Sequence, residues 1–189
     1  MAIPHEQLTL AAFLQLPEQE PALEYLEGEV RQKVSPKGQH SRLQTKWAEW
    51  VNRFAEPLEM AAAFTELRTT FGGASAVPDV VVFRWDRLPV DADGNVVNDV
   101  DEPPDLVIEI VSPDQSVAAL IRRCQWYVNN GVLIALLVDP SHRSVRAFRP
   151  GHEPALLRGA DLIDVCDVLP GFRLTVREMF AALTMRPSG

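Results

Sequence analysis

Pro104-Asp105-Leu106-Val107-Ile108-Glu109-Ile110-Val111-Ser112-Pro113 is a β-branched apolar run with an acidic residue near its centre. A short apolar run between two prolines predicts a buried β-strand. Burying an isolated ionised carboxylate is expensive, so Glu109 must be neutralised, paired with a cation or bound to a metal ion. The stretch therefore predicts both a buried strand and a functional site on it.

A second acidic residue stands at the start of another apolar run, Val77-Pro78-Asp79-Val80-Val81-Val82-Phe83. Carboxylates on two strands can hold a divalent ion such as Mg²⁺ or Mn²⁺, because these ions prefer oxygen ligands. We therefore predict Asp79 and Glu109 as catalytic metal ligands; a turn or cap role is the alternative for Asp79, which follows a proline. Asp105 lies about 13 Å from Glu109 along an extended strand, so we expect it to cap the strand instead.

The composition predicts one domain spanning residues 1–189, because 189 residues with 47% hydrophobic side chains can form one substantial core. The net charge of −8 argues against a protein that coats nucleic acid nonspecifically. It does not exclude a nuclease, because acidic metal ligands themselves lower the net charge. A basic stripe near the N-terminus either guides a phosphodiester or forms an ordinary solvated face. Its residues are Arg31, Lys33, Lys37, Arg42 and Lys46.

Two features of the sequence predict a cytoplasmic protein that makes no membrane contact. No stretch approaches the roughly 20 apolar residues that cross a bilayer. Cys124 and Cys166 both lie among apolar residues, which is typical of buried, reduced thiols.

The pattern of apolar residues predicts both strands and helices, and it predicts that the helix over 39–55 lies on a sheet. The order strand, helix, strand over residues 106–138 indicates a crossover between parallel neighbours. Glycine in Glu27-Gly28-Glu29, between two strand-like runs, indicates a hairpin. We predict helices over 5–16, 39–55, 114–130 and 176–183, and strands over 23–26, 30–34, 62–70, 77–83, 106–111, 132–138, 143–149 and 155–158.

The two acidic motifs resemble a known nuclease signature, because Pro78-Asp79 followed by Glu109-Ile110-Val111 is similar to PD-(D/E)xK. A longer series of motifs, in order and over nearly the whole chain, resembles the Uma family of restriction endonucleases. These motifs are Gly28-Glu29, His40, Pro78-Asp79, residues 104–113, Tyr127, Gly131-Val132, Val138-Asp139-Pro140 and Gly171-Phe172. The resemblance implies a restriction-endonuclease-like α/β fold, with a central mixed β-sheet flanked by helices. It also implies Mg²⁺- or Mn²⁺-dependent cleavage of DNA.

The chain departs from the family pattern at its basic residue. The general signature has a lysine where this chain has Val111, and the Uma family has a helical lysine where this chain has Arg123. The family aspartate four residues earlier is Ala119. Helical angles place Arg123 beside Tyr127, whereas Arg122 falls on the far side. Because arginine binds phosphate but does not release its proton, we predict Arg123 as a catalytic, substrate-binding cation in a weakened enzyme.

Further residues are secondary candidates for the site. Glu29 could approach it from the hairpin, and Ser112 and Gln115 could contact a water or a phosphate. Ser-Pro-Asp before a helix is also an ordinary N-cap. His40 is a candidate for substrate binding, with a cap or surface role as its alternative. Trp126 lies opposite the apolar arc of its helix, so it is either an interface residue or partly exposed, and its size favours an interface.

The leading hypothesis is therefore a divalent-metal-dependent DNA endonuclease, a hydrolase that we expect to act as a homodimer. The alternative is a catalytically inactive module on the same fold that binds nucleic acid or protein, as Val111, Ala119 and Arg123 suggest. A third possibility is hydrolysis of a different phosphoester, because the acidic composition gives no clear DNA footprint.

Overall fold

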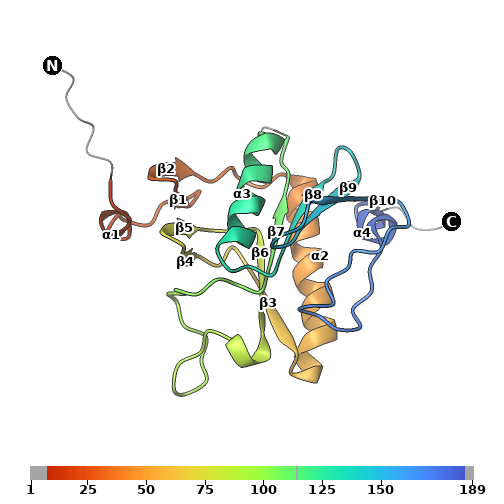
Figure 1. Ribbon diagram of the computed structural model, residues 1–189, viewed down its shortest axis with the longest axis horizontal. Helices are drawn as coiled ribbons and strands as arrows, with labels where there is room; N and C mark the ends of the chain where they lie inside the picture. Colours follow the sequence, from red (N-terminus) through yellow and green to blue (C-terminus); the bar gives the residue numbers. More distant parts are fainter. Residues whose placement is uncertain (1–7, 114, 186–189) are drawn as a thin grey trace.

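Two β-sheets form the body of the protein. The structure is a computed structural model and describes residues 8–113 and 115–185 (Figure 1). The larger sheet has the strand order β10-β9-β8-β7-β6-β3, and the smaller has the order β2-β1-β5-β4. The strands are β1 (Leu23–Leu26), β2 (Glu29–Gln32), β3 (Ala61–Thr65), β4 (Thr69–Phe71), β5 (Ala74–Ala76), β6 (Val80–Arg84), β7 (Leu106–Ile110), β8 (Ile134–Asp139), β9 (Ser144–Phe148) and β10 (Ala155–Arg158). The helices are α1 (Leu10–Phe13), α2 (Gly38–Ala55), α3 (Val117–Asn129) and α4 (Val176–Ala181), with short 3₁₀ turns η1 (Glu56–Leu58) and η2 (Trp85–Arg87).

Strand β7 lies inside the larger sheet and is buried along its whole length. It pairs in parallel with β8 and antiparallel with β6, so the sheet is mixed. Alternate residues of β7 face opposite layers: Leu106 and Ile108 pack in the core under α2, whereas Val107 packs in the core under α3. The predicted central mixed sheet flanked by helices is therefore confirmed, and Glu109 faces the α3 layer.

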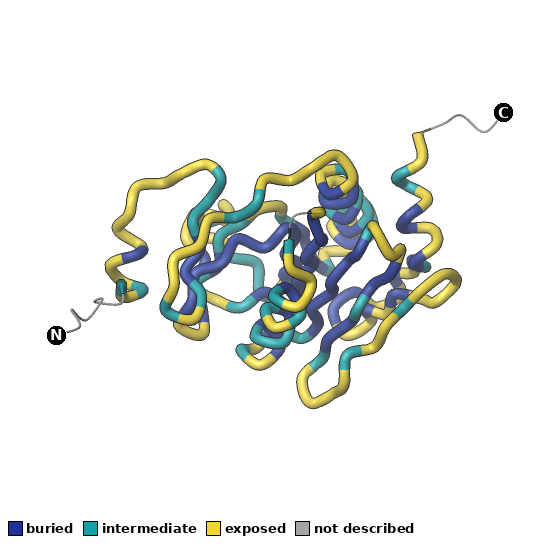
Figure 2. Tube along the Cα trace, turned by 90° about the horizontal axis from the view of Figure 1, so that it is seen from above, coloured by how far each residue is buried: buried dark blue, intermediate teal, exposed yellow. Residues whose placement is uncertain are grey.

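Helices α2 and α3 lie on opposite faces of the larger sheet (Figure 1). Helix α2 buries Leu43, Trp47 and Val51 at helical spacing, and α3 buries Leu120 and Tyr127. Figure 2 shows the buried strands running through the middle of the molecule and the exposed segments at its periphery. The amphipathic pattern of each helix thus fixes which face of the sheet it covers.

The smaller sheet begins with the predicted hairpin of β1 and β2. Glu27 and Gly28 have φ of 54° and 80°, and two consecutive positive φ values give the type I′ turn that suits a two-residue hairpin. The smaller sheet packs on the α3 side, because Phe71 of β4 and Leu26 of β1 contact the same core as Tyr127. The hairpin is thereby held beside α3, near the start of β6 and the end of β7.

The predicted strand over 62–70 is wrong, because the chain breaks there into β3 and β4, which belong to different sheets. Glu66 lies in the left-handed region with φ of 53°, which a continuous strand does not allow. Strand β5 was not predicted, although Gly72-Gly73, both with positive φ, is a hairpin turn signal. The predicted first helix is reduced to α1 in the described residues, and its positions 5–7 lie outside them, as does Asp114 of the third.

Two further expectations differ from the structure. Cys124 is buried as expected, but Cys166 is exposed, because it lies in a turn rather than in a core element. Asp105 does not simply cap a strand: it is fully buried and lies 2.6 Å from Arg87 and 3.1 Å from Arg84. It also accepts the Arg84 backbone N–H. In the described residues, no helix is both long enough and apolar enough to cross a bilayer.

We expect Asp105→Ala to lower the free energy of unfolding by about 2–3 kcal/mol, because it leaves two arginines without their buried partner. Urea unfolding followed by circular dichroism measures this effect. The control is Asp101→Ala, which removes an exposed carboxylate from the preceding loop. Equal stability of the two variants would contradict the structural role of Asp105.

Candidate active site

Asp79 and Glu109 lie side by side on neighbouring antiparallel strands. The register pairs Val80 with Ile108, and its continuation by one residue places Asp79 opposite Glu109. Both carboxylates are buried, with 2% and 3% of their surface exposed. The structure therefore brings together the two acidic residues that the sequence places at separate strands.

Three nitrogen atoms lie close to the Asp79 carboxylate. Lys33, which directly follows β2, places its Nζ 2.9 Å from Asp79 Oδ1, and His40 in the first turn of α2 places its Nε2 3.1 Å from the same oxygen. The Ile110 N–H donates to Oδ2 over 2.7 Å. Burial opposes ionisation, but the hydrogen bond from His40 and the charge of Lys33 outweigh it, so the pKa of Asp79 lies below its ordinary value. Asp79 is therefore a carboxylate at neutral pH.

Lys33 stays protonated in this environment. Burial favours its neutral form, but the negative charges of Asp79 and Glu109 and the hydrogen bond to Asp79 dominate and raise its pKa. Its Nζ also donates to the Val77 carbonyl over 2.9 Å. Lys33 thus acts as a fixed positive charge and not as a proton acceptor.

Glu109 is held by two residues of α3. The Tyr127 hydroxyl donates to Glu109 Oε1 over 2.7 Å, and Arg123 Nε lies 2.8 Å from the same oxygen. Burial raises the pKa of Glu109 to about 7, with the charge of Arg123 opposing this rise and that of Asp79 adding to it. Two adjacent carboxylates that cannot both ionise freely are typical of sites that bind a cation or move a proton.

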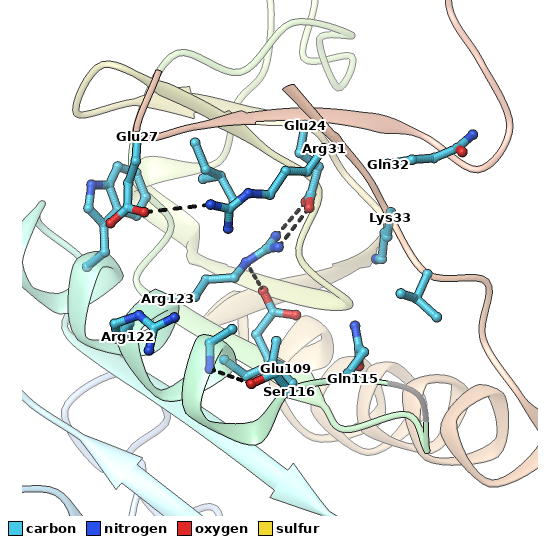
Figure 3. Close-up of a pocket in the computed structure, with 15 residues that line it drawn as sticks. Glu24, Glu27, Arg31, Gln32, Lys33, Glu109, Gln115, Ser116, Arg122 and Arg123 are labelled. Carbon is cyan, nitrogen blue, oxygen red and sulfur yellow. Dashed lines mark hydrogen bonds and ion pairs between the residues drawn. The ribbon is translucent and has the colours of Figure 1, made fainter. Parts of the chain in front are cut away.

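Arg123 bridges two carboxylates from different layers. Its terminal nitrogens bind Glu24 of β1, with Nη1 2.7 Å from Oε2, while its Nε faces Glu109 (Figure 3). Glu24 is itself buried and also accepts the Val77 N–H over 2.7 Å. The negative charges of Glu109 and Glu24 raise the pKa of Arg123 well above its usual range despite its burial. Arg123 therefore joins the smaller sheet to α3 and to β7.

A cavity of about 280 Å³ opens above Glu109, between the β1–β2 hairpin and α3. Its charged walls carry Arg31, Lys33, Arg122 and Arg123 as well as Glu24 and Glu27. Arg122 was expected on the far side of its helix, but its long side chain reaches this cavity. Glu109 forms part of the cavity wall, so the cavity gives a ligand access to this carboxylate.

The donor set fits a hard divalent cation such as Mg²⁺. Among the described residues both contacts of Glu109 fall on Oε1, which leaves Oε2 for a metal ion, and Asp79 stands opposite Glu109 in the register. Among the described residues no group of three or more acidic, histidine or cysteine side chains has the arrangement of a metal centre. Mg²⁺ commonly binds through one or two carboxylates and keeps water or substrate phosphate as its other ligands. Glu109, which lines the open cavity, and Asp79, which stands opposite it, satisfy that requirement.

The secondary candidates divide into two groups. Ser112 and Gln115 lie at the site, where Gln115 Oε1 accepts the Ser112 N–H over 2.9 Å, and His40 Nδ1 lies 2.9 Å from Ser112 Oγ. His40 thus contacts Asp79 and Ser112 and is buried, rather than presented to a substrate. Glu29 is exposed and pairs with Arg31 over 2.7 Å, so the structure does not bring it to the acidic pair.

Sequence reasoning missed Glu24 and treated Lys33 only as part of a surface stripe. Glu24 carries the same signal that identified Glu109, because it stands between Leu23 and Tyr25 within a short apolar strand. Lys33 carries no such signal, because its approach to Asp79 depends on how the smaller sheet docks.

The raised pKa of Glu109 predicts that the metal-free protein becomes less stable as pH rises. The folded state keeps this proton up to about pH 7, whereas the ordinary value is 4.5, so it binds more protons between these values and the free energy of unfolding falls across this window. Glu109→Gln should flatten the fall, measured by urea unfolding in chelator, whereas Glu29→Gln should leave it unchanged. The same slope in Glu109→Gln as in the wild type would contradict the titration of Glu109.

Comparisons with known proteins identify the family of this chain. The profile of the Uma2 family, described as a putative restriction endonuclease, matches residues 10–177. The fold is similar to the crystal structure of a putative nuclease belonging to DUF820 from Anabaena variabilis, with a TM-score of 0.90 and 37% sequence identity. That match covers 93% of this chain and 99% of that chain. No curated protein matches. Since the profile spans most of the sequence, the chain belongs to the Uma2 family of putative restriction endonucleases.

Proposed function

We propose that this protein is a divalent-metal-dependent DNA endonuclease in which Asp79 and Glu109 hold Mg²⁺ or Mn²⁺. The observation that carries this proposal is the opposition of two buried carboxylates, of which Glu109 lines a cavity that also carries several basic side chains. The similar crystal structure of a putative nuclease supports it. A bound ion would supply a water of lowered pKa and positive charge against the phosphate.

The residues around the acidic pair have separable roles in this proposal. Lys33 and His40 fix the Asp79 carboxylate, and Tyr127 fixes the orientation of Glu109. Arg123 contributes positive charge beside Glu109, where the charge of a phosphodiester would develop. Because cleavage of both strands of a duplex needs two such sites, we also propose that the protein acts as a homodimer.

The test compares the wild type with Glu109→Gln on supercoiled plasmid and on single-stranded DNA, in Mg²⁺, in Mn²⁺ and in chelator. We expect metal-dependent cleavage by the wild type and a loss of about 10²-fold or more in Glu109→Gln, because a neutral amide replaces a charged ligand. Isothermal titration with Mn²⁺ should show saturable binding that the variant lacks. Glu29→Gln, which changes an exposed glutamate of the hairpin, is the matched control and should behave as the wild type. A wild type that binds no Mn²⁺ would overturn the catalytic proposal.

The bridge made by Arg123 favours a second candidate, an inactive nucleic-acid- or protein-binding module. An arginine that already neutralises both Glu24 and Glu109 competes with a metal ion for the same carboxylate. In this case Glu109→Gln leaves DNA binding in chelator unchanged, and neither protein cleaves DNA.

Arg123→Lys separates the two candidates. A lysine has one charged nitrogen and cannot make the bidentate contact to Glu24 while also facing Glu109, so Glu109 becomes more available to a metal ion. For a weakened nuclease we expect Mn²⁺ to bind more tightly and cleavage to rise about tenfold, which corresponds to about 1.4 kcal/mol in the barrier. Arg122→Lys on the same helix is the control. A variant that neither binds Mn²⁺ nor cleaves would favour the inactive module.

A further inference from the structure

The cavity above Glu109 has the shape and the wall chemistry of a site for one nucleotide. We propose that it takes an unpaired nucleotide, so that the preferred substrate is single-stranded or locally unpaired DNA. This inference rests on the proposed nuclease function for its cleavage step, but the binding step stands on the cavity itself.

The acidic pair lies deep in the protein. Glu109 is almost wholly buried but lines the cavity, so a phosphate that enters the cavity comes to this carboxylate. A volume of about 280 Å³ is near the lower end of small-molecule sites, about 300 Å³. That is room for about one nucleotide. In a duplex each nucleotide is stacked and paired within a helix whose major groove alone is about 12 Å wide, so a duplex is too large to enter the cavity. An unpaired strand can insert one unit without paying for unpairing.

Part of the cavity wall is apolar and aromatic. Leu26, Leu120 and Trp126 line the cavity together with the polar side chains of Gln32 and Gln115. An apolar and aromatic wall cannot bind a phosphate, but it can stack on the face of a base. The amide groups can form hydrogen bonds with the edge of the base. The cavity therefore offers partners for a base as well as for a phosphate.

Trp126 is fixed in place for such a role. Its ring centroid lies 5.1 Å from that of Phe71 and 5.5 Å from that of Tyr127, and the indole is half-buried in the described structure. Trp126 thus packs within this chain and stays partly exposed, which is one of the two roles expected for it. A rigid aromatic side chain at a cavity wall is a stacking platform that needs little ordering when a base binds.

The basic residues differ in their freedom to bind phosphate. Arg123 is committed to two buried carboxylates, whereas Arg31 has half-exposed contacts with Glu27 and Glu29, at 4.0 Å and 2.7 Å. Exposed ion pairs contribute little, so Arg31 can exchange them for a phosphate at small cost. With a net charge of −8, the protein also gains little from the dense charge of a duplex, whereas base stacking does not depend on net charge.

The test measures binding of the full chain to a short fluorescein-labelled DNA strand and to the same strand in duplex form, by fluorescence anisotropy in chelator. We expect the single strand to bind about tenfold more tightly, and Trp126→Leu to weaken its binding about tenfold, as the loss of one stacked base does. Leucine keeps apolar packing against Phe71, and Trp126→Phe, which keeps an aromatic face, should retain most of the affinity. The control is Trp85→Leu, which changes a partly exposed tryptophan that does not line the cavity.

Duplex binding as tight as single-strand binding, or unchanged binding in a folded Trp126→Leu, would overturn the proposal. Cleavage assays in Mn²⁺ separate this failure from a failure of the nuclease function. If the wild type and Trp126→Leu cleave duplex and single strand equally well, the nuclease function stands and the nucleotide pocket does not. If Trp126 governs single-strand binding but no metal supports cleavage, the pocket stands and the nuclease function does not.

Discussion

The burial of Asp79 and Glu109 opposite each other, across β6 and β7, determines how the rest of the site is arranged. Two carboxylates buried beside each other repel, and each also loses its hydration. The structure meets this cost with one cation for each acid, Lys33 for Asp79 and Arg123 for Glu109. Asp79 is therefore kept ionised, while Glu109 is left poised near neutrality, which gives the two acids different properties in one site.

The same electrostatic demand explains why the smaller sheet docks where it does. Apolar contacts through Phe71 and Leu26 attach it to α3, but such contacts alone do not fix its position closely. Lys33, at the end of its hairpin, and Glu24, in its first strand, add directional contacts to Asp79 and Arg123. The hairpin thus becomes a wall of the cavity because its charged residues complete the site of the larger sheet.

The sequence was sufficient for features that depend on local pattern. The burial of Glu109 in an apolar run and the helical spacing in α3 predicted the central strand, its flanking helix and the acidic pair. It was insufficient where long-range docking or a single backbone angle decides: Lys33 meets Asp79 only through the packing of two sheets, and the left-handed Glu66 divides one predicted strand into two. Helical angles alone also misplaced Arg122, because a long side chain can reach around the edge of its helix.

The arginine at position 123 and the buried Glu24 are best understood as one unit. The planar guanidinium can contact Glu24 with two nitrogens while its Nε faces Glu109, which a lysine ammonium cannot do at once. This bridge stabilises the metal-free site, because it satisfies two buried carboxylates together. A metal ion bound at the proposed site would compete for Glu109 with this cation, so the bridge opposes metal binding while it stabilises the metal-free protein. The geometry of one side chain would therefore set the balance between stability without metal and affinity for the proposed ion.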